Sequence, residues 1–483
     1  MIKKYTYGTP FPTESVTEQF AASEGMPEFG TIHLQEGFSF TYRLRDEDIV
    51  YGLGEANRGI NKRGYQYISN NSDNAHHHED VYSLYASHNF MIVSGEQTFG
   101  LYFDYPSTLT FDVGYTRSDE LHIFCDRADL DLYVITGENP YDITKQFRKM
   151  IGRSYIAPKF AFGFGQSRWG YKTPEDFVTV AEKYRENHIP IDMVYMDIDY
   201  MDNYKDFTVN EEFRDFPQYV ENLKKDHIRL VPIIDAGVKI EEGYDVYEEG
   251  VEKNYFCKRQ DGSDFVAAVW PGYTHFPDVL NPDARKWFGE KYKRLTDAGI
   301  EGFWNDMNEP AIFFTPEGVK DVKEAMKAFI DKEETVQDVW AIGAQVTGLA
   351  NNAEDYAAMY HNVDGKMVQH DQVHNLFGYN MTRAAGEGLR EISPDKRCLL
   401  FSRSSYIGMH RYGGIWTGDN KSWWSHILLN LKMLPSLNMC VHLIFHKLCF
   451  FFPKRYKVLC INILTSSKGI CISIYIPLIG TSL

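Results

Sequence analysis

The pattern of apolar and polar positions changes character once along the chain, near residue 157. Before that point, short segments such as 99–103 run apolar or alternate, and turns rich in Gly, Asn and Asp separate them. Short strands with frequent turns are typical of an antiparallel sandwich. Residues 137–156 follow a helical pattern that an Asn-Pro pair opens. We therefore predict an N-terminal β-sandwich domain over residues 1–136 and a helical linker over residues 137–156.

After residue 157, apolar segments short enough for strands alternate with longer amphipathic segments. We predict strands at residues 160–166, 192–197, 230–235, 301–305, 398–403 and 414–417, and helices at residues 174–187, 216–226, 283–298 and 382–389. This alternation indicates a parallel sheet, and the TIM-type (β/α)8 barrel is its commonest closed form. The expected fold class is α/β, with an incomplete barrel of about six strands over residues 157–440 after the sandwich.

The predicted strands share one property, because each ends in polar residues. These residues are Gln166 and Arg168, Asp197 and Asp199, Asp235, Asp306, Arg403, and Asp419. In a barrel the carboxyl ends of the strands meet at one mouth, where such enzymes keep their chemistry. A scaffold alone does not explain polar groups at all of these ends, so we expect an active site there.

Composition narrows the classes of function. The formal net charge of -17 argues against nucleic acid and against an anionic membrane surface as partners. Aromatic residues make up 15% of the chain, which suits stacking on sugar rings and suits core packing equally well. The first residues lack the apolar run of a signal peptide, and the seven cysteines lack paired spacing. We therefore expect free thiols and a cytoplasmic location.

Two carboxylates at the predicted mouth suit the cleavage of a glycosidic bond. One carboxyl group protonates the leaving oxygen, while the other attacks the sugar or activates water. Asp306 and Asp419 are the candidates, although a helix cap or an Asx turn also explains either residue. Arg403 is suited to hold a carboxylate by a bidentate contact and keep it ionised, or to form a structural salt bridge at the rim of the barrel.

Four segments together resemble glycoside hydrolase family 31, the retaining α-glucosidases. They are Gly-Phe-Trp-Asn-Asp-Met-Asn-Glu-Pro at 302–310, Asp-Ile-Asp-Tyr-Met at 197–201, Phe-Ser-Arg-Ser at 401–404 and Trp-Thr-Gly-Asp-Asn at 416–420. The segments occur in the order of the family, and the β-rich region before them matches the family as well. The resemblance extends from the first residue to near residue 440.

The resemblance implies a role for each matching residue. Asp306 resembles the nucleophile that forms a β-glycosyl-enzyme intermediate, and Asp419 resembles the acid/base. Asp197 and Arg403 resemble residues that bind hydroxyls of the sugar in the minus-one subsite. The other residues that resemble substrate-binding positions are Asp73, Trp169, Ile198, Trp270, Trp304, Met307 and Trp416, with Trp169 near the plus-one sugar. The implied partner is an oligosaccharide substrate, no metal or organic cofactor is implied, and a homo-oligomer stays open.

One loop of the sandwich, residues 70–80, contains three consecutive histidines. The cluster suggests a metal site, but three consecutive side chains on an ordered strand or helix do not all face one ion. A polar surface loop is therefore favoured. Asp73 lies in this loop and resembles the carboxylate that the N-terminal domain of the family extends across the mouth of the barrel.

The family pattern ends abruptly after Cys440. Residues 441–483 contain no Asp or Glu and match neither half of a βα unit. A membrane anchor is disfavoured, because charges and prolines interrupt every run as long as the ~18 residues that a span needs. Translation of non-coding or out-of-frame sequence is favoured instead. Because the family continues into further barrel strands, we expect unpaired sheet edges, poor folding and weak turnover.

The leading hypothesis for function is an exo-acting retaining hydrolase. It would release α-glucose from the non-reducing ends of short α-gluco-oligosaccharides. The resemblance also allows an α-xylosidase, which differs mainly in the room around C6 of the sugar. A third hypothesis is a carbohydrate-binding remnant with impaired catalysis, which follows from the change of pattern after Cys440.

Overall fold

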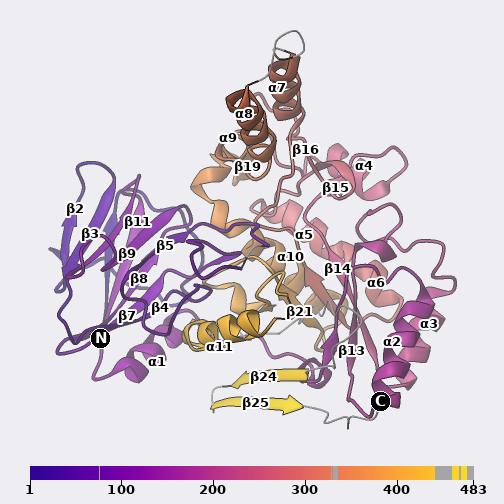
Figure 1. The fold of residues 1–483 in the computed structure, drawn as a ribbon, viewed down its shortest axis with the longest axis horizontal. Coiled ribbons are helices and arrows are strands. Elements are labelled where there is room, and N and C mark those ends of the chain that lie inside the picture. The colour runs from indigo at the N-terminus through magenta and orange to yellow at the C-terminus, as the bar shows by residue number, and fades with distance from the viewer. Residues whose placement is uncertain are drawn as a thin grey trace.

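The computed structural model describes residues 1–75, 77–327, 329, 335–421, 423–440, 460–466 and 469–475. His76 of the histidine loop, and most of the segment 441–483 on which the expectation of an out-of-frame tail rests, lie outside these residues. Figure 1 shows the N-terminal sheets on one side, the parallel strands on the other, and a helical extension at the top.

Two five-stranded antiparallel sheets form the N-terminal domain, as the alternating pattern predicts. The first sheet contains, in spatial order, β1 (Ile2–Tyr7), β11 (Leu130–Thr136), β8 (Thr98–Asp104), β7 (Phe90–Ser94) and β4 (Ile49–Gly52). The second contains β2 (Thr31–His33), β3 (Phe38–Arg43), β10 (Glu120–Cys125), β9 (Leu109–Val113) and β5 (Tyr65–Ser69). Buried side chains of both sheets, such as Leu101 and Phe40, share one core, so the sheets face each other as a sandwich.

The predicted linker helix is α1 (Pro140–Met150), and it packs against the first sheet. The Asn139 side chain accepts a hydrogen bond from the Asp142 N–H at 3.0 Å, which caps the first turn. Pro140 occupies the first helical position, where an N–H has no partner within the helix. Phe147 stacks on Phe90 of β7 with the ring centroids 3.7 Å apart.

Six parallel strands form the sheet of the second domain. In spatial order they are β12 (Gly165–Gln166), β13 (Met193–Met196), β14 (Arg229–Ile234), β18 (Gly302–Asn305), β21 (Leu399–Ser402) and β23 (Gly414–Ile415). The helices between and after them are α2 (Pro174–Glu186), α3 (Phe216–Lys225), α5 (Pro282–Lys291), α6 (Lys293–Asp297), α10 (Phe377–Ile392) and α11 (Trp424–Met439). Within the described part of the chain, β12 and β23 are the edges of this sheet. The α/β class and the six-stranded, open form of a TIM-type barrel are therefore confirmed.

The prediction of a strand over residues 160–166 is wrong in its first half. Lys159–Phe162 forms a short 3-10 helix, η1, and only Gly165 and Gln166 pair with β13. A short apolar run reads alike for a buried strand and for a buried helical turn, so periodicity did not separate the two. The sixth strand is also shorter than the predicted 414–417.

Two helices differ from their predicted bounds. The helix predicted at 283–298 is divided into α5 and α6 at Tyr292, whose buried hydroxyl donates to Asn305 Oδ1 at 2.6 Å. The helix predicted at 382–389 begins five residues earlier, at Phe377, and ends at Ile392. Tertiary contacts set these bounds, and a single sequence carries little signal for them.

Two excursions from the sheet escaped the sequence pattern. The first, after β14, contains α4 (Asp245–Glu252) and a small sheet of β15 (Val238–Lys239), β17 (Gly272–His275) and β16 (Ala267–Val269). The second, after β18, contains α7 (Pro316–Lys327), α8 (Val336–Thr347), α9 (Ala353–Ala357), β19 (Tyr360–Val363), β20 (Lys366–Gln369), η3 (His370–Gln372) and η4 (His374–Leu376). Helices α7 and α8 form the extension at the top of Figure 1.

The two domains meet where β6 (Ala86–Ser87) pairs in parallel with β22 (Ser405–Tyr406). The Tyr406 hydroxyl donates to Asp104 Oδ1 of the sandwich at 3.1 Å. Two further short helices are η2 (Ile198–Tyr200), which follows β13, and η5 (Met409–Arg411), which follows β22. The β6–β22 pairing draws the loop before β6, which contains Asp73, to the carboxyl end of β21.

The chain after β23 continues into helix α11, which ends at the buried Cys440. Further on, β24 (Cys460–Ser466) and β25 (Gly469–Tyr475) form an antiparallel pair. No helix among the described residues has the length and apolar character that a membrane crossing needs.

Candidate active site

Asp306 lies immediately after β18, where the chain leaves the sheet. Its N–H donates to the Ile234 carbonyl of β14 at 3.0 Å, which extends the strand pairing by one residue. Its Oδ1 accepts the Met307 N–H at 2.8 Å, and Met307 has a φ of 55°. A left-handed residue is uncommon outside glycine and turns the chain sharply. The carboxylate of Asp306 is therefore fixed by a tight turn at the end of a central strand.

Arg403, immediately after β21, is the centre of the site. Its guanidinium donates to Glu309 through Nε at 3.0 Å and through Nη2 at 2.6 Å. The same Nε lies 3.0 Å from Asp306 Oδ1. Its Nη1 lies 3.5 Å from Asp73 Oδ1 and 3.8 Å from Asp419 Oδ2. One cation therefore gathers four carboxylates from the ends of two strands, β18 and β23, and from a loop of the sandwich.

The four carboxylates differ in their access to water. The Asp306 side chain is 10% exposed and that of Asp73 is 19%, whereas that of Asp419 is 49% exposed. Glu309 is fully buried. A group that exchanges protons with solvent needs such access, and a group held against one face of a ligand does not. The exposures therefore suit different tasks for Asp306 and Asp419.

Tyr85 and Gly418 set the position of Asp419. The Arg403 guanidinium lies 4.8 Å from the centroid of the Tyr85 ring, and the Asp419 N–H donates to the Tyr85 hydroxyl at 3.4 Å. Gly418 has a φ of 71°, and a Cβ on it would lie 2.0 Å from the Tyr85 ring. Only glycine tolerates both conditions. The glycine before Asp419 is therefore required by the close approach of the aromatic ring.

The site carries more negative than positive charge. Burial opposes the charge of Arg403, but Asp306, Glu309 and Asp73 outweigh burial and raise the pKa of Arg403 well above its usual range. The guanidinium is therefore charged. A surplus of carboxylate around it favours a ligand that develops positive charge, such as an oxocarbenium-like transition state.

The Asp197 motif adds a further polar group to the mouth. Its Oδ1 accepts the Ile198 N–H at 2.9 Å at the start of η2, and Ile198 is buried. Asp235, at the end of β14, is close enough to Asp197 and Asp306 for both to raise its pKa, after the larger effect of burial and of Asp206. These acids therefore share one region of the mouth.

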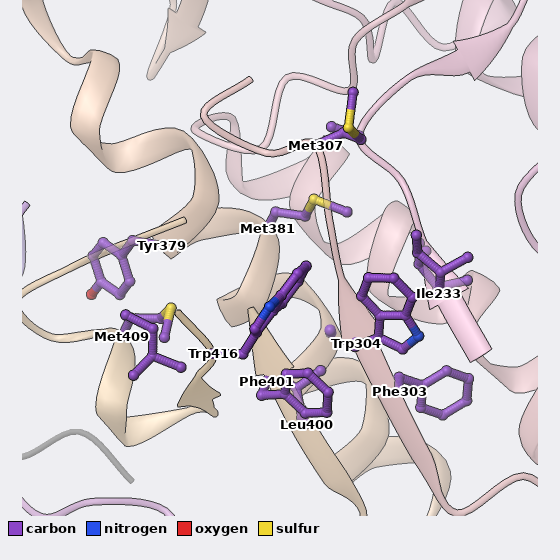
Figure 2. Close-up of a cluster of buried hydrophobic side chains, with 14 of the residues drawn as sticks. Ile233, Phe303, Trp304, Met307, Tyr379, Met381, Leu400, Phe401, Met409 and Trp416 are labelled. Atoms are coloured by element: carbon purple, nitrogen blue, oxygen red, sulfur yellow. The ribbon is translucent and has the colours of Figure 1, made fainter. Parts of the chain in front are cut away.

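Trp304 and Trp416 lie beneath the carboxylates, packed inside the barrel sheet. Each is 1% exposed, and their rings meet edge to face with centroids 5.0 Å apart. The Trp304 indole donates to the carbonyls of Met196 and Val231 at 3.2 and 3.1 Å. Figure 2 shows both indoles among Phe401 and other core side chains. Both rings are therefore buried in the barrel sheet, and their contact with a sugar stays a prediction.

Met307 is also buried, and its Sδ lies 3.5 Å from Nη2 of Arg403. Trp169 and Trp270, by contrast, are 52% and 43% exposed and pair with centroids 5.7 Å apart. Trp270 also meets Phe313 edge to face. An exposed aromatic pair on loops that follow strands is available for stacking on a sugar ring.

Three residues of the site were not singled out from the sequence. Glu309 stood in the recognised 302–310 segment, but nothing in the pattern showed that it would be the bidentate partner of Arg403. Tyr85 and Asp235 carried weaker signals. The first is an aromatic residue in a loop of another domain, and the second is one of several acids at strand ends.

A separate group could in principle hold a metal ion. Among the described residues, Cys257, Asp278 and His361 place ligand atoms within 4.8 Å of one another. His361 Nδ1 lies 2.7 Å from Asp278 Oδ1, however, which is a hydrogen-bond distance and too short for two atoms that share an ion at ordinary ligand distances. The geometry therefore fits a hydrogen bond better than a metal site.

Comparison with protein families identifies both domains. Residues 154–465 match the model for the glycosyl hydrolases family 31 TIM-barrel domain, and residues 11–112 match the family 31 N-terminal galactose mutarotase-like domain. The barrel match continues past residue 440, where the resemblance seen in the sequence ends.

Curated relatives agree with these matches. The chain is 35% identical to α-glucosidase 2 of Bacillus thermoamyloliquefaciens over 84% of its own length and 48% of the relative. It is 27% identical to an α-glucosidase of Saccharolobus solfataricus, over 91% of the chain and 61% of the relative. Alpha-xylosidase 1 of Arabidopsis thaliana is 29% identical over 72% of the chain and 40% of the relative. The chain thus spans about two fifths to three fifths of the length of these relatives.

Solved structures share the fold. A glucose complex of a Flavobacterium johnsoniae GH31 dextranase superposes with a TM-score of 0.72 at 22% identity, over 86% of this chain and 47% of the dextranase. A complex of ER glucosidase II superposes with a TM-score of 0.69 at 25% identity, over 84% of this chain and 43% of its own. At these identities the likeness speaks for the fold alone.

Proposed function

Because this chain belongs to glycoside hydrolase family 31, we propose that it hydrolyses O-glycosyl bonds as an exo-acting, retaining α-glucosidase. The observation that carries the proposal is the convergence of Asp306, Asp419 and Asp73 on the single guanidinium of Arg403, at 3.0, 3.8 and 3.5 Å. Two of these acids follow barrel strands and the third comes from the sandwich. A structural salt bridge needs one partner for Arg403, and Glu309 already supplies it.

In the proposed mechanism, Asp306 and Asp419 act in two steps. The Asp306 carboxylate attacks the anomeric carbon and forms a β-glycosyl ester, while Asp419 donates its proton to the leaving oxygen. Asp419 then takes a proton from water, whose oxygen attacks the same carbon and releases Asp306. Two inversions give net retention. The larger exposure of Asp419 fits its exchange of protons with water.

The remaining site residues are proposed to hold the sugar. Arg403 and Asp197 bind hydroxyls in the minus-one subsite, and Asp73 closes the site from the sandwich side. Closure from that side leaves room for few sugar units, which supports attack at a chain end. The exposed Trp169–Trp270 pair is placed to stack on the plus-one sugar. A location in a reducing, cytoplasmic compartment fits the four free thiols among the described residues, and thiol alkylation in intact cells followed by mass spectrometry tests it.

Hydrolysis of p-nitrophenyl α-glucoside and α-xyloside, measured side by side, tests the activity and its substrate. We expect faster turnover of the glucoside, with α-glucose as the first product by proton NMR. Asp306→Asn should abolish turnover, while Asp321→Asn on the exposed face of α7 should not. Faster turnover of the xyloside would show that the substrate is an α-xyloside and not an α-glucoside. Calorimetric binding of glucose without hydrolysis by the unaltered chain would support the carbohydrate-binding remnant instead.

A further inference from the structure

Three buried histidines form an unbroken hydrogen-bonded series outside the catalytic site. His361 Nε2 lies 2.8 Å from His370 Nδ1, and His370 Nε2 lies 2.8 Å from His374 Nδ1. His361 belongs to β19, and the other two belong to η3 and η4. Figure 1 shows this orange segment between the helical extension and the N-terminal sheets. The series therefore runs from the excursion of the barrel toward the sandwich.

Each end of the series meets an oxygen atom. At one end, His361 Nδ1 lies 2.7 Å from Asp278 Oδ1, and the other oxygen of Asp278 accepts the Asn362 N–H at 2.6 Å. At the far end, His374 Nε2 lies 2.7 Å from the carbonyl of Asn71. A backbone carbonyl only accepts hydrogen bonds, so His374 must donate to it.

Asn71 connects the series to the catalytic site. Its N–H donates to Asn375 Oδ1 at 2.9 Å, and its side chain donates to the Ser404 hydroxyl at 2.7 Å. Two residues further along the chain is Asp73, 3.5 Å from Arg403. The carbonyl that receives the last hydrogen bond of the series is thus part of the segment that carries Asp73 to the mouth.

The number of hydrogens in the series follows from its ends. Four contacts join Asp278, three imidazoles and the Asn71 carbonyl, and each needs one hydrogen. A neutral imidazole carries one N–H, so three neutral rings supply three. The fourth hydrogen must be on the Asp278 carboxyl, or one ring must be an imidazolium beside an ionised Asp278. Both arrangements contain the same number of protons.

The neighbouring groups place the fourth proton at the Asp278 end. Burial and the adjacent rings lower the pKa of His370 well below its ordinary value, and burial lowers that of His374 to about 4. Both rings are therefore neutral near pH 7. Burial also raises the pKa values of Cys257, whose Sγ is 3.6 Å from His361, and of Tyr356, whose ring packs on His370 and His374.

Charged side chains also lie near the series. Glu309, Asp73, Arg403 and Asp355 act on Tyr356, with smaller effects on its pKa than burial has. Lys258 and Asp264, on the segment that carries Cys257, pair with each other at 2.5 Å. Because His370 and His374 are neutral, the fourth hydrogen belongs to the contact between Asp278 and His361.

We propose that the series of Asp278, His361, His370 and His374 retains one proton beyond those of three neutral imidazoles. Through Asn71, the series positions Asp73 beside Arg403. The four are positioning residues, since none of them touches the site itself. The positioning part rests on the proposed function, because Asp73 is there taken to face the sugar. Loss of the extra proton at high pH leaves one of the four contacts without a hydrogen and loosens the Asn71 segment.

Asp278→Asn removes the acidic proton but keeps the hydrogen bonds of the series. Its amide nitrogen donates to His361 Nδ1 while its oxygen accepts the Asn362 N–H, so all four contacts keep a hydrogen and none of these is acidic. Asp278→Ala removes the donor. We expect Asp278→Asn to melt within about 3 °C of the unaltered protein at pH 7, and Asp278→Ala to melt several degrees lower.

The pH dependence of melting gives the sign of the effect. The folded protein holds a proton that the unfolded Asp278 and histidines have lost above about pH 6.5. Its stabilising contribution is present at lower pH and is lost when the series gives up this proton at higher pH. Between pH 7 and 10, the melting temperature of the unaltered protein should therefore fall relative to that of Asp278→Asn. If the melting temperatures of the two proteins change equally with pH, the proposal of an extra proton is wrong.

The kinetic readout tests the positioning. His374→Phe keeps an aromatic ring but removes the hydrogen bond between the series and the Asn71 carbonyl. We expect KM for the glucoside to rise about fivefold, as for one lost hydrogen bond, with little change in kcat. His33→Phe, at an exposed position of β2, is the matched control. A fall in kcat alone, or an unchanged KM, would overturn the positioning.

Nitrogen-15 NMR of the unaltered protein, labelled on histidine, needs neither a variant nor turnover. We expect a hydrogen between every facing pair of ring nitrogens at pH 7 and a protonated Nε2 on His374. A facing pair without a hydrogen, or an unprotonated His374 Nε2, would overturn the proposal. If the protein hydrolyses no glycoside, the proposed function fails. The melting and NMR experiments still test whether the series retains the extra proton.

Discussion

Arg403 donates to both carboxylate oxygens of Glu309, at 3.0 and 2.6 Å, and the two side chains are 2% and 0% exposed. This buried bidentate pair fixes the plane of the guanidinium. Nη1 of Arg403 then faces Asp73 and Asp419, while Nε, which also donates to Glu309, lies 3.0 Å from Asp306 Oδ1. The geometry of the proposed catalytic pair therefore depends on a residue that no substrate reaches.

Replacement of Glu309 by Gln should destabilise the protein strongly. It leaves a buried cation with a neutral partner, and breaking a buried pair costs about 3 kcal/mol. The free energy of unfolding in urea measures the loss. Glu317→Gln is the matched control, because Glu317 also pairs with an arginine, Arg259, but is 60% exposed. That change should cost less than about 1 kcal/mol. Equal losses for the two variants would contradict the role of burial.

Gly418→Ala should reduce kcat by more than about tenfold, because the new Cβ collides with Tyr85 and displaces Asp419. Steady-state hydrolysis of p-nitrophenyl α-glucoside measures the effect. Gly365→Ala separates collision from backbone strain, since Gly365 has a φ of 80° and no described atom lies within 4 Å of its added Cβ. The control should lose stability and keep its kcat. A normal kcat for Gly418→Ala would show that Asp419 needs no such fit.

Glu55→Gln should stabilise the protein at neutral pH. Glu55 is buried, and within the described residues neither of its carboxyl oxygens has a hydrogen-bond partner. Burial, and then the nearby Glu309, raise its pKa well above the ordinary 4.5. Folding therefore keeps Glu55 protonated after the unfolded chain has lost this proton, and stability falls as pH rises from 4.5 toward the folded pKa.

The glutamine variant has no such proton. Between pH 4.5 and the folded pKa of Glu55, its advantage in the free energy of unfolding should grow by about 1.4 kcal/mol per pH unit. Below pH 4.5 this advantage should vanish. Urea unfolding at pH 4, 6 and 8 measures this difference. An advantage that is the same at all three values would indicate better packing and not the loss of a buried acid.

Asp419→Asn should slow the hydrolysis of a substrate more when its leaving group needs a proton. Hydrolysis of a disaccharide should fall by about 10²–10⁴, because its leaving oxygen must be protonated. Cleavage of α-glucosyl fluoride needs no proton donor in the first step and should fall less. The ratio of the two rates, compared with that of the unaltered protein, measures the effect. An equal fall for both substrates would remove the acid role from Asp419.

The sequence predicted the parts of the site that follow parallel strands. Asp306 and Arg403 stand directly after apolar segments of strand length, and strand ends converge in any barrel. Trp304 shows the limit of that reasoning. A strand of a parallel sheet is covered on both faces, so an aromatic residue in it carries no sign of which face, or which depth, it occupies. Its burial emerged only from the packing of β13, β14 and β18, where its indole donates to the carbonyls of Met196 and Val231.

Contacts between distant segments were harder to predict. The loop with Asp73 reaches Arg403 because β6 pairs with β22. The family resemblance implied that Asp73 extends to the mouth, but the residue pattern of 70–80 carries no sign of Arg403 as its partner. The excursion with His361, His370 and His374 was likewise left without structure in the sequence analysis. Its short elements, such as β19 and η3, are held by tertiary hydrogen bonds and have little periodicity of their own.

The central claim is that Asp306 is the nucleophile of a retaining hydrolase, and covalent trapping tests it most directly. The protein is incubated with 5-fluoro-α-glucosyl fluoride, whose second fluorine slows release of the intermediate, and is then analysed by intact mass and peptide mapping. The account predicts one added fluoroglucosyl group on the peptide that contains residues 302–310, attached to Asp306 and absent from Asp306→Asn. Hydrolysis of the glucoside by a protein that carries the label on another residue, or that keeps its turnover after Asp306→Asn, would contradict it.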